Sequence, residues 1–207
     1  MIPSTQAIER EAQRLLQDNH FMFDPQPSVA EEEAAEPEEG RLQLPLRDFI
    51  RQAWEVVEPA TVFLNNWHID AIADHLEAVT YGQIRRLIIN IPPRCMKSLA
   101  VSVFWPAWSW TLDPDPDEVD HGRSVRPGTW AGPGTRFLFS SYAHALSIRD
   151  SVKCRRVILS PWYQSHWGGR LRLTYDQNQK IRFDNDRGGY RLSTSVDGAL
   201  TGEGGDI

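Results

Sequence analysis

The feature that most constrains the fold is a pair of apolar runs separated by a short polar loop. Residues 86–91 read RLIINI, a run typical of a strand that is buried on both faces of a sheet. Two prolines end this run, and the residues that follow the loop read SLAVSVFWPAWSW, which is apolar almost all round, as in a helix packed against a sheet. Pro106 is expected to kink this helix or to end its first part. The predicted order is therefore strand, loop, helix.

Periodicity predicts the elements around this unit. Apolar residues at helical spacing predict helices over 46–57, 69–76 and 143–159. Apolar or alternating stretches predict a strand at 136–141 and small antiparallel strands at 171–176, 180–186 and 188–196. The proline- and glycine-rich residues 112–135 predict a long loop.

The charge is unevenly distributed along the 207 residues, which are enough for one hydrophobic core or one domain with an appendage. Residues 1–40 carry ten acidic and two basic side chains, a net of −8 within a chain of net −6, and they predict a short helix and a flexible acidic linker before a domain at 41–207. Residues 136–191 carry eleven basic and four acidic side chains, a net of +7. This basic segment is either a solvated face or a surface for a phosphate backbone.

The two cysteines, Cys95 and Cys154, form no CxxC pair, so we expect reduced thiols and neither a disulfide framework nor a cysteine zinc site. The histidines lack the spacing of metal ligands. An apolar stretch long enough for a membrane span or a signal peptide is also lacking in the sequence, which predicts a soluble, intracellular protein.

The loop between the apolar runs has the composition of a phosphate-binding loop at one end only. It consists of Pro93, Arg94, Cys95, Met96, Lys97 and Ser98. In the pattern G-x-x-x-x-G-K-[ST], backbone N–H groups wrap the phosphates, the lysine neutralises them and the hydroxyl binds magnesium at a helix N-terminus. This loop keeps Lys97 and Ser98 but has neither glycine, and Met96 stands directly before the lysine. An ordinary strand-to-helix turn with a surface lysine is the alternative.

A wider resemblance favours the phosphate loop. The large terminase subunit of tailed bacteriophages has a Walker A region similar to RRLIINIPPRCMKSLAVSVFWPAW, with a Pro-Pro-Arg-x-x-Lys-Ser core that tolerates a residue other than glycine before the lysine. Its second strand and long helix resemble RFLFSSYAHALSIRDSVKCRRVILSPWYQ, and the segment before its Walker B strand resembles GGYRLSTSVDGALTGEGGDI. The likeness covers residues 45–207.

The resemblance implies a P-loop NTPase fold, which is an α/β three-layer sandwich with a mostly parallel sheet, added antiparallel strands and preceding helices. It also implies ATP and Mg²⁺ as cofactors. Lys97 would contact the β and γ phosphates, and Ser98 would bind the magnesium ion. Arg94 and Lys97 are the candidate catalytic residues. Arg94 would either act on the γ phosphate or brace the loop through a salt bridge. Cys95 and Met96 would donate backbone N–H groups.

In that family the adenine is bound by the helical region before the first strand, where Trp67 and His68 are candidates by position. Most tryptophans of this chain are nevertheless expected in the core, since large aromatic side chains dominate burial. This expectation covers Trp54, Trp67, Trp105, Trp108 and Trp110.

The resemblance also implies an activity and its partners. The chain would be the N-terminal part of an ATPase motor that packages viral DNA into the procapsid, and the complete protein would also cut the DNA concatemer. The expected partners are double-stranded DNA, the portal protein, the small terminase subunit and further copies of the chain in a ring, in the cytoplasm of a bacterial host, with no membrane.

Two departures from the family pattern limit this expectation. Glu203 stands between Gly202 and Gly204 where the family has a basic residue. The sequence ends at Ile207, before the family's Walker B aspartate, its catalytic glutamate and its nuclease domain, so these 207 residues alone are expected not to hydrolyse ATP. The alternative is a truncated, catalytically inert fragment that acts at most as a nucleotide- or DNA-binding module.

Overall fold

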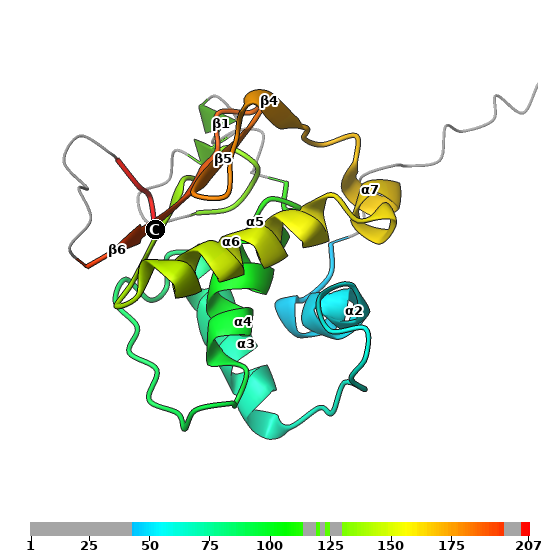
Figure 1. The fold of residues 1–207 in the computed structure, drawn as a ribbon, viewed down its shortest axis with the longest axis vertical. Helices are drawn as coiled ribbons and strands as arrows, with labels where there is room; N and C mark the ends of the chain where they lie inside the picture. Colours follow the sequence, from blue (N-terminus) through cyan, green and yellow to red (C-terminus); the bar gives the residue numbers. More distant parts are fainter. Residues whose placement is uncertain (1–42, 114–118, 121–122, 125–129, 197–203) are drawn as a thin grey trace, which may run out of the picture. The chain divides into compact units, whose positions relative to one another are not determined.

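A computed structural model describes residues 43–113, 119–120, 123–124, 130–196 and 204–207, which belong to one unit of the chain (Figure 1). The helix and acidic linker predicted within residues 1–40 lie outside the described residues, and so does much of the loop predicted at 112–135. In the described part of that loop, Val119–Asp120 (β1) and Arg123–Ser124 (β2) form a small antiparallel pair. No helix of the described residues is long and apolar enough to cross a membrane.

The two helices predicted before the apolar run are present as Leu46–Val57 (α2) and Trp67–Thr80 (α3). Each places its apolar residues on one face, and on α2 that face is buried through Leu46, Phe49, Ile50, Ala53, Trp54 and Val57. The Leu46 N–H donates to Glu77 Oε1 at 2.6 Å, so the start of α2 is tied to α3. Periodicity therefore predicted both helices correctly.

The helix after the loop runs through three consecutive stretches, Lys97–Leu99 (α4), Ala100–Phe104 (η2, a π-helix) and Trp105–Ser109 (α5). Pro106 neither ends this helix nor leaves a backbone acceptor without a partner. It has no N–H to donate to the carbonyl four residues earlier, that of Ser102. Instead Arg191 donates from Nη2 to the Ser102 carbonyl oxygen at 3.0 Å. The π-helical turn precedes the proline, as expected where the regular hydrogen-bond ladder is interrupted.

The main sheet has four strands in the order β3-β6-β5-β4, and it corrects the predicted fold class. Its strands are Phe137–Ser141 (β3), Leu173–Asn178 (β4), Arg182–Asn185 (β5) and Tyr190–Ser195 (β6). In this sheet only β3 and β6 are parallel, while β6 with β5 and β5 with β4 are antiparallel. The prediction of a P-loop NTPase sandwich with a mostly parallel sheet is therefore wrong for the described structure, although the predicted strands at 136–141 and in 171–196 are present.

The run 86–91, predicted as a strand buried on both faces, explains the difference. It lies in no strand, and the described structure contains no backbone hydrogen bond that joins it to another residue. Leu87, Ile89 and Ile91 are half-buried, while Ile88 is 85% exposed. An apolar run shows that side chains favour burial, but a strand also needs a neighbouring backbone for its N–H and C=O groups. Such a neighbour can come from any part of the chain, so an apolar run by itself does not specify it.

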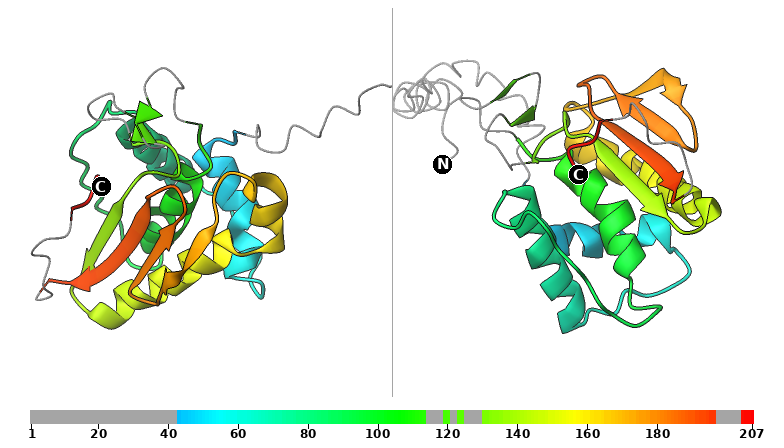
Figure 2. Two further views of the ribbon diagram at one scale, coloured as in Figure 1. Left: turned by 90° about the horizontal axis from the view of Figure 1, so that it is seen from above. Right: turned by 90° about the vertical axis from the view of Figure 1, so that its left-hand side faces the viewer.

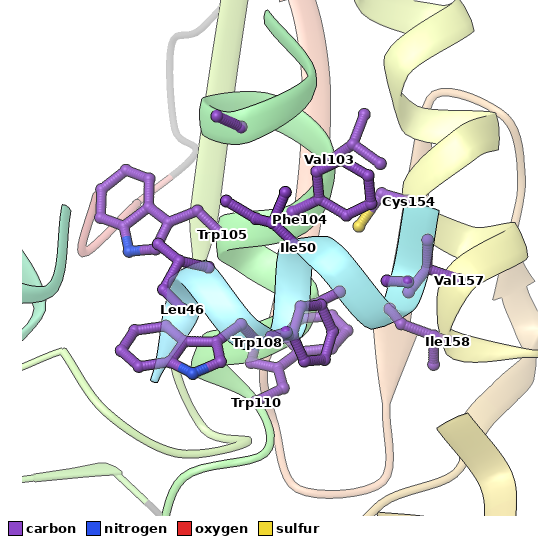
Figure 3. Packing of buried hydrophobic residues seen from close by; sticks show 14 of the residues in the cluster. Leu46, Ile50, Val103, Phe104, Trp105, Trp108, Trp110, Cys154, Val157 and Ile158 are labelled. Carbon is purple, nitrogen blue, oxygen red and sulfur yellow. The ribbon is translucent and has the colours of Figure 1, made fainter. Parts of the chain in front are cut away.

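A long helix, His144–Ile158 (α6), covers one face of the sheet across β3 and β6 (Figure 2), close to the predicted 143–159. The core lies between this helix, α2 and the helix after the loop, as the close view of Ile50, Phe104 and Val157 shows (Figure 3). A further helix, Pro161–Trp167 (α7), was not predicted. Its start carries two recognisable signals: Pro161 at the first helical position, and the Ser160 hydroxyl, which accepts from the Tyr163 N–H at 3.1 Å.

Candidate functional site

The backbone of the loop before Lys97 is left-handed at two residues that are not glycine. Arg94 has φ of 70° and Met96 has φ of 60°, and these are the only non-glycine residues with positive φ in the described structure. A left-handed conformation is unfavourable for a residue with a Cβ atom, and such strained residues cluster at functional sites. Residues that alternate in the sign of φ also turn their N–H groups towards one side, which forms a concave anion-binding nest. The loop therefore has the backbone geometry of an anion site.

The position of Met96 explains why the common pattern has glycine before the lysine. The resemblance implies that a residue other than glycine is tolerated before the lysine. The structure adds that this position needs a positive φ, which glycine adopts without strain. Met96 adopts it as well, and its side chain packs against the core.

The helix that starts at Lys97 presents unpaired N–H groups at the same place. Its first intrahelical bond runs from the Ala100 N–H to the Met96 carbonyl at 2.9 Å, and no side chain of the described residues caps this end. The preceding N–H groups of a helix have no partner inside it, and they favour anions together with the helix dipole. The side chains of Lys97 and Ser98 are exposed. Both flank the N–H groups that the loop and the helix direct outward.

A cavity of about 570 Å³ opens over this loop. Its walls come from three places in the chain: the loop itself, the end of α2 with the residues after it, and α6. Three cationic side chains line it, those of Arg94, Lys97 and Arg149. Among the described residues of the lining, Glu58 is the one carboxylate, and it forms an ion pair with Lys153. The cavity is therefore strongly cationic, as a site for a multiply charged anion needs to be.

The loop residues Arg94 to Ser98 all line the cavity, and so does Pro93. Arg149 was missed, because in the sequence it is one of several cations on an amphipathic helix. Only the packing of α6 beside the loop directs it into the cavity. Glu203, at which the sequence departs from the family pattern, lies outside the described residues, and so does Gly202.

A second, mainly apolar groove of about 490 Å³ adjoins this cavity. It lies between α3 and the extended residues 87–92, and Ile91, Pro92 and Cys95 line both spaces. Trp67, which lines this groove, is 78% exposed, so the expectation of a core position is wrong for this tryptophan. It is right for the other four, namely Trp54, Trp105, Trp108 and Trp110. Trp67 and His68, the adenine candidates, thus lie on a groove beside the loop.

The two cysteines lie in different environments, Cys95 in the loop and Cys154 on α6. Both are free, and Cys154 is fully buried between α6 and the core. Burial raises the pKa of the Cys154 thiol to about 12, so it stays protonated near neutral pH. The described residues also contain no cluster of three or more His, Cys, Asp or Glu side chains that could hold a metal ion.

Magnesium that arrives with a nucleotide needs fewer protein ligands. Mg²⁺ keeps several waters and is bound mainly through phosphate oxygens, so a single protein hydroxyl is a fitting partner. The exposed Ser98, next to Lys97 on the cavity wall, fits this part.

Comparisons of the chain with protein-family models, with curated proteins and with solved structures find no match.

Proposed function

We propose that the loop of Pro93 to Ser98 binds the phosphates of ATP, and that the chain is the ATP-binding part of a phage terminase large subunit. One observation carries the first half of this proposal. The left-handed residues Arg94 and Met96 and the helix start at Lys97 all line one cavity, which three cationic side chains also line. Such a nest at a helix N-terminus is a phosphate-binding arrangement.

The side chains can be given roles in this site. Lys97 neutralises the β and γ phosphates, and Ser98 is the protein ligand of Mg²⁺, which when bound offsets phosphate charge. Arg94 contacts the γ phosphate rather than bracing the loop. Arg94 is exposed and forms no ion pair with a described residue, and both observations support this choice.

The second half of the proposal rests on the sequence motifs. In the complete protein this ATPase would drive DNA into a procapsid and cut the concatemer, in the cytoplasm of the bacterial host. Its partners would be the portal protein, the small terminase subunit and further copies of the chain in a ring. The net charge of +7 over residues 136–191 supports contact with the phosphate backbone of double-stranded DNA.

A nucleotide- or DNA-binding module without turnover is the second candidate, and one observation favours it. Hydrolysis needs a carboxylate that orients water or holds the metal shell. Glu58 is the one carboxylate among the described residues that line the cavity, and its ion pair with Lys153 engages it already.

A titration with a fluorescent ATP analogue tests the phosphate site. Lys97→Ala should weaken binding by roughly tenfold to a hundredfold, because charge-assisted hydrogen bonds contribute about 1.5 to 3 kcal/mol. The matched control is Lys180→Ala, which removes an exposed lysine outside the cavity and should leave the affinity unchanged. Equal affinity of the wild type and Lys97→Ala would remove the assignment of the loop. Measurement of phosphate release by the same samples separates the ATPase from the module that only binds.

A further inference from the structure

Arg149 belongs to the same cavity as the phosphate loop although it lies far along the chain, on α6. No motif singles it out, and the loop pattern ends at Ser98. Of the other basic side chains on α6, Lys153 is paired with Glu58, and Arg155 and Arg156 line a different cavity beside Leu159 and Pro161. Arg149 is thus the cation of α6 that the fold directs towards the loop.

A buried carboxylate holds Arg149 in place. Asp150 Oδ1 accepts from Arg149 Nε at 3.0 Å and lies 2.9 Å from Nη2. The Asp150 side chain is only 8% exposed, whereas that of Arg149 is 53% exposed. Nη1 has no hydrogen bond to a described residue. One edge of the guanidinium is therefore fixed by a rigid, buried partner, and the rest is available to a ligand.

This arrangement matters more for binding than for folding. A half-exposed ion pair contributes little to stability because solvent screens it. An arginine whose orientation is already fixed, however, loses less conformational freedom when it binds an anion. Arg94 and Lys97 line the same cavity without an ion pair to a described residue, so an anion with several charges is favoured there.

The position of Arg149 also suggests which part of the ligand it meets. It lines the cavity over the loop but not the apolar groove, which lies on the other side of Ile91, Pro92 and Cys95. A nucleotide whose base lies towards Trp67 and His68 would extend its phosphates across the loop and away from that groove. Its last phosphate would then be the one nearest to α6.

We propose that Arg149 contacts the terminal phosphate of a bound nucleoside triphosphate and so distinguishes it from a diphosphate, with Asp150 as the residue that positions the guanidinium. This inference rests on the proposed phosphate site. Arginine suits the task because its planar fork matches the spread charge of a terminal phosphate.

The test compares the affinities of fluorescent ATP and ADP analogues for the wild type and for Arg149 variants. Arg149→Ala should weaken ATP binding by about tenfold or more and ADP binding by less than about threefold, since the lost contact is charge-assisted. Arg149→Lys keeps the charge without the planar fork, so its affinity for ATP should lie between those of the wild type and Arg149→Ala. Arg156→Ala is the matched control on the same helix and should leave both affinities unchanged.

The outcomes separate this inference from the proposed function. If Lys97→Ala weakens ATP binding but Arg149→Ala does not, the role of Arg149 is refuted and the phosphate loop stands. If Arg149→Ala weakens ATP and ADP equally, the assignment to the terminal phosphate is refuted. If the wild type binds neither nucleotide, both proposals fail. Circular dichroism of each variant checks that the fold is intact, and Arg149→Lys keeps the test decisive if the alanine variant unfolds.

Discussion

The left-handed backbone at Met96 should affect how glycine and alanine at this position change the free energy of unfolding. Met96→Ala and Met96→Gly remove the same side-chain contacts beyond Cβ, so the difference between them reports the backbone. A Cβ in the left-handed region costs about 1 to 2 kcal/mol, which glycine avoids. Glycine also gains freedom in the unfolded chain, which costs about 0.4 to 1 kcal/mol of stability. With φ at 60°, Met96→Gly should therefore be more stable than Met96→Ala by about 0.5 to 1 kcal/mol.

Leu99 provides the matched comparison. It lies a few residues further on, also packs partly against the core, and has φ of −67°, where a Cβ is not strained. Leu99→Gly should be less stable than Leu99→Ala by about 0.5 to 1 kcal/mol, since glycine has only its entropic cost there. The order of alanine and glycine should thus reverse between the two positions, with a total difference of about 1 to 2 kcal/mol.

Urea unfolding, followed by the fluorescence of the buried tryptophans, measures these differences. A difference of about 1 kcal/mol corresponds to about 2 to 4 °C in melting temperature for a chain of this size, so thermal unfolding is a second readout. The reasoning is refuted if glycine is less stable than alanine at position 96 by as much as at position 99. In that case the loop would not hold a positive φ at Met96, and the nest would lose its basis.

Two further predictions concern the sheet and the core. Gly189→Ala should destabilise the protein by about 1 to 3 kcal/mol in urea unfolding, because the new Cβ would collide with the carbonyl oxygens of Pro133 and Thr135, while Gly169→Ala, with nothing within 4 Å, should be neutral. Burial raises the pKa of Cys154 from 9.0 to about 12, so the native state keeps a proton that the unfolded chain releases. The free energy of unfolding should then fall as the pH rises through this interval, and it should fall less in Cys154→Ala. A fall in Cys154→Ala as steep as in the wild type would contradict this account. For the glycines, the contradicting result is an effect of Gly169→Ala equal to that of Gly189→Ala.

Local sequence patterns could predict those elements whose formation does not depend on one particular distant segment. The helices α2, α3 and α6 were predicted because one apolar face at helical spacing needs only some core to bury it. The strand β3 followed from a short apolar run between turns. The run 86–91 is also apolar but has no backbone hydrogen bond to a described residue, and an apolar run alone cannot distinguish the two cases. The prediction of the fold class was wrong because it treated this run as a strand of a mostly parallel sheet.

The candidate site shows the same division. Lys97 and Ser98 could be proposed from the end of a loop pattern and from the resemblance, because both are local features of the sequence. Arg149 could not, since its place depends on how α6 packs beside the loop. The sequence also does not show the backbone angle of Met96, which decides whether glycine is needed there.

The two ends of the loop are anchored differently. The candidate site therefore does not require the mostly parallel sheet that the sequence predicted. On the far side of the loop, Arg191 is fully buried, donates to the Ser102 carbonyl and lies 4.5 Å from the centre of the Phe139 ring. The helix that carries Lys97 is thereby fixed to β6 and β3. On the near side, residues 86–91 have no backbone partner within the described structure. A phosphate site needs its N–H groups and its lysine held by the helix, whereas the incoming segment only has to supply the chain that reaches them. The geometry of the site therefore depends on the packing of this helix and not on a parallel strand before the loop.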